Sequence, residues 1–75
     1  MTTLIEQVAA RQRHTISPAL ARAIRQGAGV TQAEIAAELG VHPFTVYRWE
    51  RGTRRPGHGT QEAYTRLLRQ LQELT

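Results

Sequence analysis

A run of twenty residues, Gln32 to Arg51, restricts the fold of this chain more than any other part of the sequence. It reads QAEIAAELGVHPFTVYRWER and contains two short helical patterns on either side of Gly40. Ala36 lies where the two helices would cross, and a larger side chain there would push the second helix away. Gly40 lies in the turn, where glycine readily adopts a positive φ. The run therefore predicts two short helices packed closely across a tight turn.

The apolar residues of this run indicate which faces pack together. Val46 and Trp49 are three residues apart on one face of the second helix, and we expect them to pack onto Ile35 and Ala36. Two helices joined in this way by a short glycine-containing turn form a helix-turn-helix unit. The alternative is an ordinary helical hairpin, which does not need a small residue at the crossing.

The opposite face of the second helix carries Phe44, Tyr47, Arg48 and Arg51, whose spacing of i, i+3, i+4 and i+7 places them side by side. Arginine binds O6 and N7 of guanine in a bidentate manner, and an aromatic ring packs on the methyl group of thymine. We therefore expect Arg48 to read a base and Phe44 to contact a methyl group. The alternatives are that Phe44 fills a gap beneath the last helix and that Tyr47 is half-buried, with its hydroxyl on a phosphate.

Start signals define the helices of the central part of the chain. Ser17 followed by Pro18 predicts a helix start, and Gly27 and Gly29 predict its end. The inward residues of that helix are expected to be Leu20, Ala21 and Ile24. Thr31 and Glu34 have the spacing of a capping box, and His42 before Pro43 is expected to cap the helix that ends near Gly52.

Two outer helices complete a predicted all-α domain of five helices. Thr3 and Glu6 have capping-box spacing before an N-terminal helix over residues 4–13. Thr60 is expected to cap a C-terminal helix over residues 60–74, whose apolar stripe consists of Tyr64, Leu67, Leu68, Leu71 and Leu74. A chain of 75 residues is the size of one small domain, so residues 1–75 are expected to form a single domain.

Positive charge is concentrated after the second helix of the unit. Residues 48–55 contain four arginines and Glu50 alone as an acid, so they account for +3 of the net charge of +4. A basic patch beside an outward helix face is typical of proteins that bind a polyanion, although a solvated charged face is the alternative. The sequence has no cysteine and no apolar run long enough to cross a membrane, so we expect no membrane partner.

The segments VTQAEIAAELGV and TVYRWERGTRRP, especially Trp49-Glu50-x-Gly52, resemble the Cro and phage-repressor type of helix-turn-helix proteins, the large family named for the xenobiotic-response-element regulators. The resemblance covers about residues 18–56, and residues 4–13 look like an addition to the family core. It implies a compact, lambda-repressor-like fold. His42-Pro43 departs from the family habit of a serine or threonine followed by a polar residue, so base preference does not transfer.

The resemblance implies a role for each matching position. The residues of the reading face would be His42, Pro43, Phe44, Tyr47 and Arg48. The residues at the DNA phosphates would be Gln32, Arg51, Arg54 and Arg55. The family also pairs the acid at the position of Glu50 with an arginine of the first core helix, which implies an Arg25–Glu50 ion pair that braces the second helix.

A single unit of this kind makes few contacts, so we expect a homodimer on a palindromic stretch of double-stranded DNA. The candidate dimer residues are Leu4, Ile5, Val8, Leu71 and Leu74. The simplest function is a small repressor of a phage or mobile element that blocks a promoter, in a prokaryotic or phage-infected cytoplasm. An autorepressing antitoxin and an excisionase-like architectural protein fit equally well, and a protein-docking module is the alternative from another class.

Catalytic chemistry finds no support in the sequence. There is no aspartate, and the one serine, Ser17, is already used as a cap. His14, His42 and His58 are widely spaced and lack partners at ligand distance, so we expect no metal site. We also expect no cofactor and no small-molecule ligand.

Overall fold

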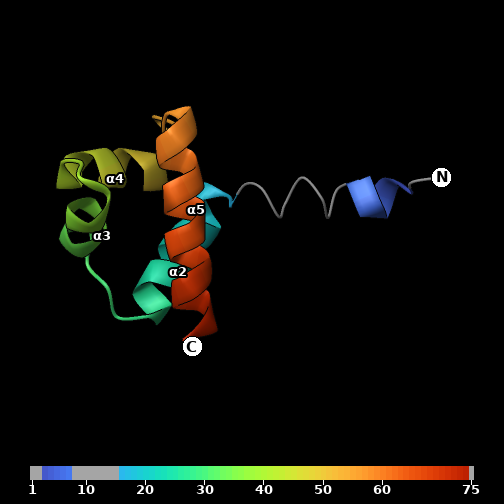
Figure 1. Cartoon of the computed structure of the whole chain (residues 1–75), viewed down its shortest axis with the longest axis horizontal. Helices are drawn as coiled ribbons and strands as arrows, with labels where there is room; N and C mark the ends of the chain where they lie inside the picture. The colour runs from blue at the N-terminus through green and yellow to red at the C-terminus, as the bar shows by residue number, and fades with distance from the viewer. Residues whose placement is uncertain (1–2, 8–15, 75) are drawn as a thin grey trace.

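The computed structural model describes residues 3–7 and 16–74. All regular structure in these ranges is helical: a helical turn over residues 4–7, then α2 (Pro18–Gly27), α3 (Gln32–Leu39), α4 (Pro43–Glu50) and α5 (His58–Glu73) (Figure 1). The predicted all-α class is confirmed. Of the N-terminal helix predicted over residues 4–13, positions 8–13 lie outside the described residues. None of the described helices combines the length and apolarity that a membrane span requires.

Three of the helix starts follow the capping signals in the sequence. The Ser17 hydroxyl accepts a hydrogen bond from the backbone N–H of Leu20 at 3.2 Å, and Pro18 follows at the first helical position. Thr31 and Glu34 form the predicted capping box of α3. His42 caps α4, because its Nδ1 accepts from the N–H of Phe44 at 3.0 Å. These three predictions are confirmed.

The start of α5 was predicted wrongly. The helix begins at His58, two residues before Thr60, and its N-cap is Gly57, without a side-chain hydrogen bond. Gly57 has an extended backbone, and its carbonyl accepts from the N–H of Gln61 at 2.7 Å. Because glycine is tolerated as an N-cap, the helix begins after Gly57, although Thr60 has the better capping side chain.

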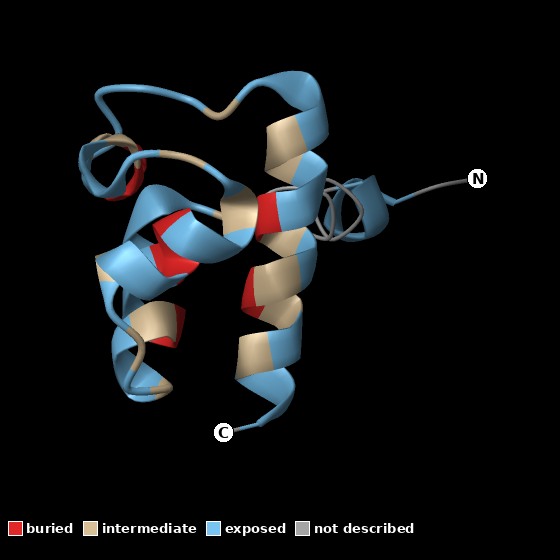
Figure 2. Ribbon diagram, turned by 60° about the vertical axis from the view of Figure 1, so that its left-hand side comes forward, coloured by how far each residue is buried: buried red, intermediate tan, exposed pale blue. Residues whose placement is uncertain are grey.

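The core lies where the inward faces of the four helices meet, and Figure 2 shows the buried residues gathered on those faces. Eight hydrophobic residues are buried there: Ala21, Ile24, Ile35, Ala36, Val46, Trp49, Tyr64 and Leu68. This confirms the expected packing of α4 on α3. Leu20 was expected to face inward but is 43% exposed, because it lies at the edge of the buried sector of α2, about 40° around the helix from Ile24 and about 100° from Ala21.

The turn between α3 and α4 depends on the backbone of Gly40. Its φ of 69° and ψ of 33° are left-handed, and the next N–H, of Val41, donates to the carbonyl of Ala36 at 2.9 Å. A side chain here would meet open space, so any cost of adding one comes from the backbone conformation alone. This turn sets the direction in which α4 leaves α3.

We predict that Gly40→Ala lowers the free energy of unfolding by about 1–2 kcal/mol, the cost of a left-handed non-glycine residue. Gly59→Ala is the matched control, because Gly59 lies inside α5, has open space around it and does not have a positive φ. It should instead stabilise the fold by roughly 0.4–1 kcal/mol. Urea unfolding measures both changes, and equal unfolding midpoints for the two variants would contradict this account of the turn.

Trp49 and Tyr64 join α4 to α5 through their rings, whose centroids are 4.9 Å apart at an interplanar angle of 44°. Both side chains are buried, yet the Trp49 Nε1 and the Tyr64 hydroxyl have no hydrogen-bond partner among the described residues. Burial, and secondarily the negative charge of Glu50, raises the pKa of Tyr64 to about 12. The hydroxyl is therefore kept neutral at a cost to the fold.

We predict that Tyr64→Phe stabilises the protein by about 1–3 kcal/mol below pH 10, since it removes a buried polar group without a partner.

The raised pKa of Tyr64 also predicts that the wild-type protein loses stability between pH 10 and 12. In that range tyrosine ionises in the unfolded chain, while Tyr64 stays protonated in the folded one. Urea unfolding from pH 7 to 12 tests both points. If the wild-type protein and Tyr64→Phe lost stability equally above pH 10, Tyr64 would not be the group responsible.

Candidate nucleic-acid interface

The outward face of α4 presents two aromatic rings to solvent. Phe44 is 57% exposed and Tyr47 is 40% exposed, and their rings stack with centroids 5.6 Å apart and an interplanar angle of 18°. Phe44 therefore does not fill a gap beneath α5. Both residues lie in the first two turns of α4, near the turn that joins this helix to α3.

Two arginines lie against these rings. The Arg48 Cζ is 5.7 Å from the centroid of Phe44, and the Arg51 Cζ is 5.7 Å from the centroid of Tyr47. Both distances are within the range of a cation–π interaction. Neither guanidinium has a hydrogen-bond or carboxylate partner among the described residues, so the donors of both remain free for a ligand. The face thus combines flat apolar surface with fixed positive charge.

The loop after α4 extends the basic surface. The N–H and hydroxyl of Thr53 both donate to the carbonyl of Arg48, at 3.1 and 3.2 Å, and hold the start of the loop against the end of α4. Arg54 and Arg55 follow and are exposed. They line a cleft of about 470 Å³ together with residues of α2, α4 and α5, among them Trp49. The loop arginines thus continue the basic segment beyond the end of α4.

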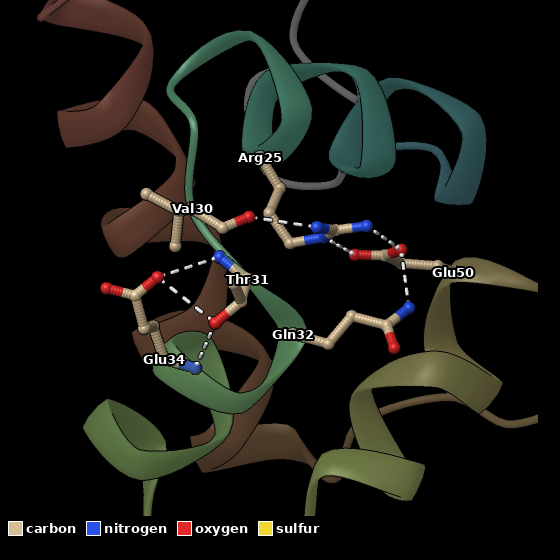
Figure 3. Close-up of polar contacts among 6 residues, drawn as sticks. All are labelled: Arg25, Val30, Thr31, Gln32, Glu34 and Glu50. Carbon is tan, nitrogen blue, oxygen red and sulfur yellow. Dashed lines mark hydrogen bonds and ion pairs between the residues drawn. The ribbon is translucent and has the colours of Figure 1, made fainter.

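The acid within this basic segment is neutralised from inside the molecule (Figure 3). The Glu50 carboxylate, only 3% exposed, accepts from the Arg25 Nε at 2.6 Å, from its Nη2 at 3.0 Å, and from the Gln32 Nε2 at 3.0 Å. The Arg25 Nη1 also donates to the carbonyl of Val30 at 2.9 Å. The hydrogen bonds to Glu50 raise the pKa of Arg25. One carboxylate thus ties α2 and α3 to the end of α4.

This pairing changes the charge balance of the surface. Because Arg25 compensates Glu50, the only acid of residues 48–55 is already paired, and none of the four exposed or half-exposed arginines there forms an ion pair within the described part of the chain. The structure thus contains the ion pair that the family resemblance implied. The bond from Gln32 to Glu50 was not foreseen, and nothing in the local sequence around Gln32 signals a partner eighteen residues away.

Of the residues assigned to the reading face, Phe44 is in contact with both Tyr47 and Arg48, and His42 and Pro43 are exposed at the start of the same helix. The candidate dimer residues differ in exposure. Leu4, Ile5 and Leu74 are 71%, 81% and 81% exposed. Leu71 is partly buried and packs against the core instead. Val8 lies outside the described residues. Among the described residues, no cluster of three or more potential metal ligands occurs.

The fold and this surface define a helix-turn-helix protein of the DNA-binding class. The family model described as "Helix-turn-helix domain" matches residues 19–75, and the chain belongs to that family. The match begins one residue into α2 and runs through α5, so it includes every helix that builds the core. Comparison with curated proteins gave no match, and neither did comparison with solved structures.

We predict that Arg25→Ala destabilises the fold by about 3–5 kcal/mol, because it leaves the buried Glu50 charge without its main partner. Arg22→Ala is the matched control: it removes an exposed arginine from the same helix and should change stability by no more than about 0.5 kcal/mol. Thermal or urea unfolding measures both. Equal stability of the two variants would show that the ion pair does not brace α4.

Proposed function

We propose that this protein is a sequence-specific regulator that binds double-stranded DNA and represses transcription by blocking a promoter. The observation that carries the proposal is the outward face of α4, where two exposed rings lie against two arginines that have no hydrogen-bond or carboxylate partner among the described residues. The chain continues from this face into a basic loop. A helix of a helix-turn-helix unit enters the major groove with its N-terminal residues at the base edges. On that basis His42, Pro43, Phe44, Tyr47 and Arg48 would face the bases.

The remaining positive groups suit the phosphates on either side of the groove. Arg51, Arg54 and Arg55 are exposed, and they lie after the reading residues along the chain. Gln32 uses one Nε2 hydrogen on Glu50 and has a second for a phosphate oxygen. Because Glu50 is buried and paired, its charge opposes phosphate binding far less than a free carboxylate would. These contacts would fix the register of α4 without reading sequence.

We propose that two copies bind a palindromic operator, with half-sites one helical turn apart, about 34–36 Å. The exposed side chains of Leu4, Ile5 and Leu74 offer apolar surface for such a dimer. A Cro-like or immunity repressor of a phage or mobile element fits this size and mechanism. An autorepressing antitoxin or an excisionase-like protein would use the same surface, and a toxic neighbouring gene would favour the antitoxin.

A second candidate function rests on the exposed Phe44–Tyr47 stack. Aromatic residues dominate the hot spots of protein–protein interfaces, so the same face could dock a protein. Salt dependence separates the two functions, because a DNA-binding protein releases counterions and loses affinity steeply as salt rises. A docking module would barely bind duplex DNA at any salt concentration.

Selection of binding sites from a random duplex pool tests the proposal directly. We expect a palindromic sequence with a fixed spacing between its halves. Failure to enrich any sequence, together with weak binding that does not depend on salt, would contradict the proposal and favour the docking function.

We also predict different effects for two arginines on binding to the selected operator. Arg48→Ala should relax the base preference at one position of each half-site by about 1–3 kcal/mol. Arg55→Ala should weaken binding to all sequences alike and reduce the slope of log K against log salt by about 1 per protomer. Arg66→Ala, on the exposed side of α5, is the control and should change neither. If Arg55→Ala lost base preference and Arg48→Ala did not, Arg55 would read a base and Arg48 would not, contrary to this assignment.

A further inference from the structure

Phe44 and Arg48 form one unit on the reading face. They are four residues apart on α4, and the guanidinium carbon of Arg48 lies 5.7 Å from the centre of the Phe44 ring. More than half of the Phe44 surface stays exposed in spite of this contact and of the stack with Tyr47. Pro43 and Tyr47 are exposed as well, whereas Val46 and Trp49 of the same helix are buried, so the outward side of α4 offers apolar surface to a ligand.

The contact also prepares Arg48 for a planar partner. A guanidinium that lies against an aromatic ring has fewer orientations to lose on binding, and its fork matches two acceptors on one edge. The Arg48 donors have no acceptor among the described residues, and the side chain is half-buried beside the ring. The arginine is therefore held in place and unoccupied, as readout of a guanine edge requires.

The size of the unit fits a short stretch of the major groove. The 5.7 Å between guanidinium and ring centre lies between one and two base-pair rises of about 3.4 Å each. With Arg48 on a guanine, Phe44 would lie over the next base pair or the one beyond. The only apolar group that a base pair presents in this groove is the C5 methyl of thymine.

We propose that Phe44 and Arg48 together read a guanine and a thymine one or two base pairs apart, with the guanine edge on Arg48 and the thymine methyl on Phe44. This inference rests on the proposed DNA-binding function and adds the base step that the protein selects. Tyr47 and Arg51, the second stacked pair, carry polar groups at their tips and lie one turn further along α4. They suit a phosphate or a base edge rather than a methyl group.

The test uses the operator recovered from the random pool and the wild-type chain. Each thymine of a half-site is replaced in turn by deoxyuridine, which removes the methyl group and keeps the base pair. Replacement of each guanine in turn by 7-deazaguanine locates the guanine that Arg48 contacts. At that position the loss of N7 should weaken binding of the wild-type chain but not of Arg48→Ala. We expect one deoxyuridine, one or two base pairs from that guanine, to weaken binding about fourfold per half-site, equivalent to ~0.8 kcal/mol for one methyl group.

Variants of the ring assign the effect to Phe44. The same deoxyuridine should cost Phe44→Ala almost nothing, whereas Tyr47→Phe, which keeps the stack and removes only a hydroxyl, should retain the fourfold loss. Phe44 is exposed, so its replacement should leave the fold intact. The deoxyuridine measurements on the wild-type chain test the proposal even if a variant fails to fold.

Three outcomes would overturn the inference. Deoxyuridine could be neutral at every thymine, its cost could fall three or more base pairs from the guanine, or its cost could persist in Phe44→Ala. Each of these leaves selective DNA binding intact. If the pool yields no selected sequence at all, the proposed function fails and this inference fails with it, so the two failures are told apart at the first step.

Discussion

The buried carboxylate of Glu50 holds the arrangement of three helices on which the proposed interface depends. A charge so well shielded from solvent requires partners, and it obtains them from Arg25 on α2 and Gln32 on α3. Because Arg25 also binds the carbonyl of Val30, the connection between α2 and α3 is held in the same network. The end of α4 is thereby fixed against two helices at once. An apolar contact of the same size would hold it with less directional precision.

Sequence reasoning predicted the parts of the fold that are encoded locally. The caps at Ser17, Thr31 and His42 depend on a side chain and a backbone N–H two or three residues away, so a short stretch of sequence contains all the information. The left-handed turn at Gly40 is local in the same sense. The packing of Val46 on Ala36 was predictable for another reason, since a small residue at a helix crossing restricts its neighbours.

Features that depend on distant side chains escaped prediction from the residues. The Gln32–Glu50 bond joins positions far apart in the chain, and it appears only once α3 and α4 are in place. The exposure of Leu20 reflects which sector of α2 meets the other helices, which its own periodicity left ambiguous. On α4 the spacing predicted that Phe44 and Arg48 share a face. It did not predict that the arginine would lie against the ring.

The uneven placement of charge described for residues 48–55 has a consequence for how the molecule meets a partner. Four of the ten arginines lie in eight residues at one end of α4, and the rest of the chain is close to neutral. Such a distribution makes the charge of the chain asymmetric, and a strong external field acts on an asymmetric charge before contact is made. Near a highly charged rod the protein would rotate so that this end leads, and a larger share of collisions would begin in a productive orientation.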